Sequence, residues 1–191
     1  MKNQTLIELI EKLEIKSISN SSLDILDESE SRYVKDLKVN LSKTLRSDNL
    51  EEKTNLLVAL SIAANQKNDF LIKYFKNLAN ESGANKEEVA EAVACASLLA
   101  ANNVFYRFRH FMDDEDYNRI PAGVKMNIMM NPVTGKKTFE LMSLAVSAVN
   151  GCEQCVISHE QSLINLGMSK EQIFEAVRTA SIVCSLDRII N

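Results

Sequence analysis

The chain has 191 residues, of which 46% are hydrophobic and 25% are charged, and its formal net charge is −4. This length fits one domain, residues 1–191, and the acidic balance argues against a basic nucleic-acid-binding protein. No uninterrupted apolar run approaches the about 18 residues of a membrane span, and the first residues lack the apolar core of a secretory signal. We therefore expect a cytoplasmic protein that binds neither nucleic acid nor a membrane.

The sequence predicts an all-α fold. Five glycines and two prolines are too few for the many tight turns of a β protein. Asp48 and Asn85 are expected to cap two of the helices, and Gly83 is expected to end the helix before Asn85. Apolar residues at helical spacing predict helices over residues 3–15, 33–45, 49–64 and 69–82, and another from residue 85 onward.

An internal repeat organises the chain. Residues 83–100 resemble residues 167–184 at an offset of 84, and eight of these 18 positions are identical. We therefore predict the duplication of a multi-helix unit, with a degenerate N-terminal half at about residues 1–101. The C-terminal half, at about residues 132–191, carries all the chemically active groups discussed below.

Residues 102–132 lie between the two halves. Aromatic and basic residues occupy positions 105–111, acidic residues follow at 113–116, and then come Met126, Met129 and Met130. Basic residues interleaved with aromatic ones can bind single-stranded nucleic acid, but this stretch is short and borders the acidic run. We expect a packing segment that contributes to an oligomer interface, with the acidic run as a solvated turn.

Two cysteines and a histidine form the candidate active site. Asn150 and Gly151 predict a break between helices, so Cys152 would lie in the first turn of a new helix, where the helix dipole favours a thiolate. Cys155 and His159 follow on the same face. Two cysteines one turn apart can close a disulfide, and histidine can accept a thiol proton near neutral pH. Reach favours Cys155 as the attacking thiol, because Cys152 is about 10 Å of helix rise from His159.

The spacing alone leaves other interpretations open. Glu140 would be a surface residue unless the chain folds back at Asn150, since it would lie about 18 Å from Cys152 on one unbroken helix. A zinc site would need a fourth ligand such as Glu140 or Glu160, and no second pair of cysteines is available at such spacing. The Cys-x-x-Cys pair could also be purely structural. Cys95 and Cys184 are expected to be small buried side chains.

At these positions the sequence resembles a known family. Glu140 with Asn150-Gly151-Cys152-x-x-Cys155-x-x-x-His159-Glu160 is similar to the signature of AhpD-type alkyl hydroperoxidases, within the carboxymuconolactone decarboxylase-like superfamily. Residues 102–110 also resemble the central segment of that family. The likeness and the internal duplication together cover most of the chain.

The resemblance implies an all-α homo-oligomer, often a trimer, that reduces peroxides with cysteine. It implies a lipoyl group or another dithiol as the reductant, an AhpC-type peroxiredoxin as a possible partner, and a proton relay between Glu140 and His159. One departure concerns Gln154, which stands where close members carry a histidine, because glutamine cannot shuttle a proton near pH 7. The decarboxylases of the superfamily lack the Cys-x-x-Cys pair, which disfavours that activity.

These observations predict a thiol-dependent alkyl hydroperoxide reductase. Cys155, assisted by His159 and Glu140, attacks the peroxide and becomes a sulfenic acid, and Cys152 resolves it into a disulfide. We expect no bound cofactor or metal, because an external dithiol reduces the disulfide. The alternatives are a disulfide reductase or adaptor that passes electrons to a peroxiredoxin, and a zinc-binding or structural oligomeric protein.

Overall fold

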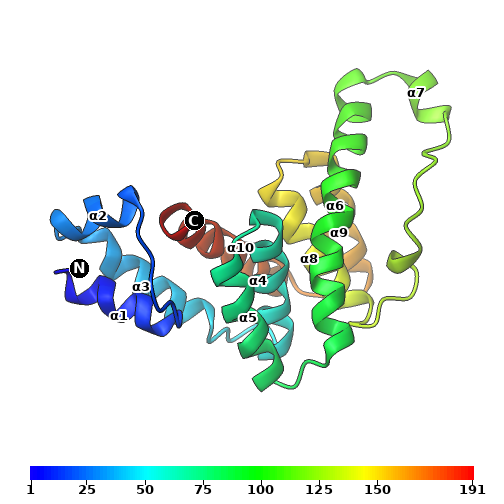
Figure 1. The fold of residues 1–191 in the computed structure, drawn as a ribbon. Coiled ribbons are helices and arrows are strands. Elements are labelled where there is room, and N and C mark those ends of the chain that lie inside the picture. Colours follow the sequence, from blue (N-terminus) through cyan, green and yellow to red (C-terminus); the bar gives the residue numbers. More distant parts are fainter.

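The computed structural model describes residues 1–191, and it is built of helices without strands (Figure 1). The all-α prediction is therefore confirmed. The α-helices are α1 Gln4–Lys12, α2 Ser21–Glu28, α3 Tyr33–Thr44, α4 Glu52–Gln66, α5 Asp69–Glu81, α6 Lys86–Met112, α7 Glu115–Arg119, α8 Lys136–Val149, α9 Glu153–Asn165 and α10 Lys170–Ile190. A short 3-10 helix spans Asn127–Met129.

The helices α4 and α8 form the centre of the fold. All residues from 55 to 63 of α4 and from 139 to 147 of α8 are buried. A helix that is apolar on all its sides is buried on all sides, and α4 contacts α5, α6, α8 and α10, while α8 also contacts α6, α9 and α10. A charged residue on α8 must therefore find its partner inside the protein.

The three N-terminal helices cover one end of this bundle. Both α2 and α3 contact α10, and α1 packs on α3, as Figure 1 shows at the blue end of the chain. The side chain of Asn20, which caps α2, donates a hydrogen bond to the carbonyl oxygen of Ile189 at the end of α10. This contact joins the first helices to the last one.

The predicted helix starts are correct in part. Asn85 caps α6 through its side chain, with Glu88 bonding back to the Asn85 backbone at 2.9 Å. The prediction of Asp48 as a cap is wrong, because α4 begins after Glu51, whose side chain makes no capping bond. In the turn before α4, the Ser47 hydroxyl instead accepts hydrogen bonds from the backbone N–H groups of Asn49 and Leu50.

Helix starts recur at the offset of the sequence repeat. The helices α4, α5 and α6 begin at residues 52, 69 and 86, and α8, α9 and α10 begin at 136, 153 and 170, which is 84 residues later in each case. Common boundaries do not by themselves establish an ancestral duplication, which stays a prediction. The helix α6 continues past residue 101 to Met112, so the end expected for the first half falls inside a helix.

An arm, residues 113–132, connects α6 to α8. Figure 1 shows the C-terminal end of α6 and the short α7 projecting away from the other helices, with the chain returning along the outside. The buried Glu91 carboxylate anchors the return, because it accepts hydrogen bonds from the backbone N–H groups of Val133 and Thr134 at 2.8 and 2.7 Å. By length and composition α6 could cross a membrane, but it packs here against α4, α8 and α9.

Candidate active site

A sharp turn between α8 and α9 brings the predicted site residues together. Gly151 adopts a positive φ of 68°, which L side chains rarely adopt, and it lets the chain reverse directly after α8. Cys152 is the N-cap of α9, so it precedes the first turn of the helix in which it was expected. Its backbone N–H donates to the carbonyl oxygen of Ser147, which fixes the turn against the end of α8.

Side chains from α4 and α6 hold this turn through Asn150. The Asn150 carbonyl oxygen accepts a hydrogen bond from the Arg107 guanidinium at 2.8 Å. The Asn150 side chain donates to Asn103 Oδ1 and accepts from Asn65 Nδ2, both at 2.9 Å. Asn103 in turn donates to the Ser147 hydroxyl at 2.9 Å. Side chains from two helices thus hold the residue before Gly151.

Cys152 and Cys155 form a disulfide across the first turn of α9, with their Cα atoms 5.3 Å apart. The two side chains differ in their access to solvent. Cys152 is fully buried, whereas Cys155 is 7% exposed and lies at the surface of a cavity. A reagent that comes from solvent therefore meets the Cys155 sulfur first.

Glu140 and His159 form a buried pair beside the disulfide. Glu140 Oε2 lies 2.6 Å from His159 Nδ1, and both residues are only 8% exposed. The turn at Asn150 folds α9 back along α8. This reversal is what Glu140 needs in order to reach the cysteines and His159. A carboxylate on Nδ1 fixes the orientation of the ring and leaves Nε2 free for another partner.

A cavity of about 360 Å³ adjoins Cys155 and His159. Cys152 does not line it. The lining combines apolar and polar side chains, from α6, from the arm and from α9: Leu99, Asn102, Tyr106, Met126, Met129, Gln154, Cys155, Ser158 and His159. Its volume suits a small organic molecule, so one accessible thiol and one buried acid–base pair meet at a site of ligand size.

Most of the chain aligns with proteins named alkyl hydroperoxide reductase AhpD. A relative from Coxiella burnetii (strain Dugway 5J108-111) is 40% identical over 160 residues, which cover 82% of this chain and 90% of the relative. Relatives from Anaeromyxobacter dehalogenans (strain 2CP-C) and Streptomyces griseus subsp. griseus are 40% identical over 164 and 166 residues, 85% of this chain, and cover 87% and 91% of their own lengths. A model of the carboxymuconolactone decarboxylase family matches residues 115–191.

The chain belongs to the AhpD family. The resemblance inferred from the sequence is therefore confirmed, and the relatives' names identify the family as one of peroxide reductases. The matched range 115–191 contains Glu140, Cys152, Cys155 and His159.

This AhpD-family chain keeps its other two cysteines out of the site. Burial raises the pKa of Cys95 to about 12, so that thiol stays protonated at neutral pH, and its Sγ atom lies 3.6 Å from the Ser143 hydroxyl. Burial also raises the pKa of Cys184, whose sulfur accepts a hydrogen bond from the Gln66 side chain. Cys95 is the buried thiol that the sequence predicts, whereas the prediction is wrong for Cys184, which is only partly buried. No group of three or more His, Cys, Asp or Glu side chains is arranged to hold a metal ion.

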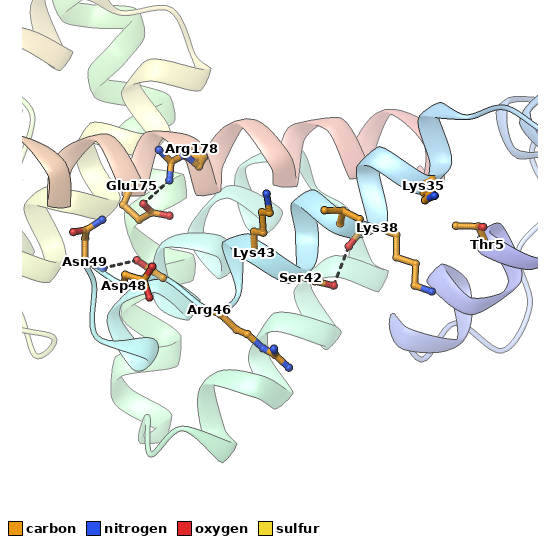
Figure 2. A pocket seen from close by; sticks show the side chains of 12 residues that line it. Thr5, Lys35, Lys38, Ser42, Lys43, Arg46, Asp48, Asn49, Glu175 and Arg178 are labelled. Atoms are coloured by element: carbon orange, nitrogen blue, oxygen red, sulfur yellow. Dashed lines mark hydrogen bonds and ion pairs between the residues drawn. The ribbon is translucent and has the colours of Figure 1, made fainter.

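A larger cavity lies elsewhere, between α3 and α10, with a volume of about 780 Å³ (Figure 2). Its cationic side chains do not converge. Arg178 is paired with Glu175, Lys38 is paired with Glu8, and Figure 2 shows Lys43 and Arg46 pointing in opposite directions. We regard this cavity as a solvated groove.

Sequence reasoning missed the residues that surround the four predicted ones. Asn103 and Arg107 belong to the segment that resembles the family's central segment, and this likeness was the single signal for them. Met126 and Met129 were assigned to packing at an oligomer interface, but both line the cavity next to Cys155. Their role depends on how the arm folds back, which no local pattern encodes.

Proposed function

We propose that this protein is a thiol-dependent alkyl hydroperoxide reductase in which Cys155 is the thiol that attacks the peroxide. The observation that carries the proposal is the cavity that Cys155 and His159 share, with Glu140 hydrogen-bonded to the other side of the His159 ring. A thiol and a base that line the same cavity, with a carboxylate that orients the base, are the groups that an activated nucleophile requires.

The first step oxidises Cys155. His159 takes the proton of the reduced Cys155 thiol, and Glu140 stabilises the charged imidazolium that results. The thiolate attacks the terminal oxygen of the hydroperoxide, the O–O bond breaks, and that oxygen stays on sulfur as a sulfenic acid. The departing alkoxide takes the proton from His159 and leaves as the alcohol.

The second and third steps regenerate the enzyme. The Cys152 thiol attacks the sulfenic sulfur, a disulfide forms, and the sulfenic oxygen leaves as water. An external dithiol, such as a lipoyl group, then exchanges with the disulfide and becomes a disulfide itself. We assign the first attack of this donor to the Cys155 sulfur, because Cys152 is fully buried. No bound cofactor takes part, and we place the protein in the cytoplasm.

One observation favours a second candidate function. Gln154 lines the cavity at the position between the two cysteines, and it cannot shuttle protons. A slower reaction with peroxide would leave disulfide exchange as the main activity. The protein would then act as an adaptor that carries electrons from a dithiol donor to an AhpC-type peroxiredoxin.

Stopped-flow measurements separate the two functions. The fully reduced protein is mixed with cumene hydroperoxide, and thiol oxidation is followed with and without an AhpC-type peroxiredoxin. Direct peroxidase activity predicts fast oxidation by the peroxide alone, with saturation as the cavity fills. Oxidation that requires the oxidised peroxiredoxin supports the adaptor and rejects the peroxidase.

A further inference from the structure

The cavity beside Cys155 has a wall that the proposed chemistry leaves without a role. The helix α9 contributes Cys155 and His159, and the other side comes from α6 and the arm. Three residues of that wall, Asn102, Met126 and Met129, contact one another. They lie at least 23 residues from the cysteines in sequence, so the packing of α6 and the return of the arm bring them to the site.

Asn102 holds both methionine sulfurs. Its Nδ2 atom lies 3.1 Å from the Met126 sulfur and 3.8 Å from the Met129 sulfur, and it donates to both. A thioether sulfur accepts such bonds weakly, so each bond serves mainly to fix the direction of a flexible side chain. The two methionines are thereby held in the cavity wall.

The same contacts leave one polar atom of Asn102 without a partner. The side chain is 5% exposed, and its Oδ1 atom makes no hydrogen bond within the protein. In this orientation the amide N–H groups, which can donate to sulfur, face the methionines. Asn102 lines the cavity, so its unpaired amide oxygen is available to accept a hydrogen bond from a ligand with an O–H or N–H donor.

We infer that Asn102, Met126 and Met129 recognise the substrate: Asn102 Oδ1 accepts the hydrogen bond of the hydroperoxide O–H group, and the methionines pack against its organic part. This inference rests on the proposed function. The hydroperoxide O–H proton remains on the oxygen that is transferred to Cys155, so this hydrogen bond orients the reacting oxygen without removing a proton.

The wall selects for organic hydroperoxides over hydrogen peroxide. Methionine is flexible and polarizable, so one pair of side chains fits organic groups of several shapes. Hydrogen peroxide has no organic group to pack against the methionines, so it can only form the hydrogen bond with Asn102. The two kinds of contact can therefore be removed separately.

A kinetic comparison tests the selectivity. In the Met126→Ala/Met129→Ala double variant, we expect the rate constant for Cys155 oxidation by cumene hydroperoxide to fall roughly tenfold or more, and that for hydrogen peroxide to change less than about twofold. Met130→Ala is the matched control, because Met130 is 67% exposed and does not line the cavity. Asn102→Ala should slow both peroxides. Equal losses for both peroxides in the double variant would overturn the inference.

A binding experiment without turnover keeps the test independent of folding defects and of the peroxidase activity. The wild-type protein is labelled with methyl-¹³C methionine and titrated with cumyl alcohol, the product expected from cumene hydroperoxide. We expect the methyl signals of Met126 and Met129 to shift with saturation, while that of Met130 stays in place. Shifts without peroxidase activity would reject the proposed function and retain the binding wall. Peroxidase activity without these shifts would reject the wall alone.

Discussion

Glu140 is a carboxylate on α8, one of the two central helices of the protein. Removing a charged group from water is costly unless it is paired and hydrogen-bonded, and its observed partner is His159, 2.6 Å away. The pair therefore places a base next to Cys155 with its ring direction fixed, and a neutral residue in place of Glu140 should leave the base present but poorly oriented.

We predict that Glu140→Gln slows the oxidation of Cys155 by peroxide by about 10²–10⁴-fold, the usual contribution of an acid–base group. Glutamine is close to isosteric, so circular dichroism should report an unchanged helical fold. The matched control is Glu160→Gln, next to His159 in sequence but without a hydrogen bond to it. An unchanged rate of Cys155 oxidation in the Glu140→Gln protein would show that Glu140 has only a structural role.

The turn between α8 and α9 is the element on which the chemistry depends. Arg107 donates to the carbonyl of Asn150, and Asn103 and Asn65 hold its side chain. Bonds made by a charged donor contribute about 1.5–3 kcal/mol. Because the turn sets how closely Cys152 approaches Cys155, loosening it should weaken the closed disulfide relative to the dithiol.

We predict that Arg107→Ala makes the disulfide easier to reduce, with a midpoint potential higher by about 30 mV if roughly 1.4 kcal/mol falls on the disulfide state. Equilibration with a dithiol buffer measures this shift. Arg107→Lys should restore part of the wild-type potential. Arg109 donates to the Ile120 carbonyl oxygen in the arm, so Arg109→Ala should not change the potential. A potential equal to that of the wild type in Arg107→Ala would show that the turn is held without it.

At the scale of the whole molecule, the arm and the end of α6 expose apolar side chains. Six of them are exposed near the projecting end: Phe108, Phe111, Met112, Tyr117, Ile120 and Val124. Clustered exposed apolar groups mark interaction surfaces. We propose that this surface joins copies of the chain, as the family resemblance implies.

Light scattering should therefore give a mass that is a multiple of 21.4 kDa. A Phe111→Asp/Ile120→Asp double variant should shift the population towards the monomer, because two charges would be buried in the interface. Ile25→Asp is the control, since Ile25 is equally apolar and exposed on α2, far from the arm. A monomeric wild type at micromolar concentration would contradict the prediction.

The sequence predicts local features of this protein well and distant contacts poorly. The start of a helix at Asn85 and the common face of Cys155 and His159 follow from spacing within one or two helical turns. The contact of Glu140 with His159 requires the reversal at Gly151, which the sequence indicates without fixing its direction. Arg107 reaches Asn150 across 43 residues, and such a contact depends on how α6 packs on α8, a property of the whole bundle.

The account depends most on Cys155 as the first thiol to be oxidised. The direct measurement treats reduced Cys152→Ser and Cys155→Ser proteins with one equivalent of cumene hydroperoxide and dimedone, followed by peptide mass spectrometry. Cys95, whose pKa is raised to about 12 by burial, stays a thiol and serves as an internal reference. We predict a dimedone adduct on Cys155 in the Cys152→Ser protein and no first turnover in the Cys155→Ser protein. A first turnover preserved in Cys155→Ser, with the adduct on Cys152, would reverse the assignment.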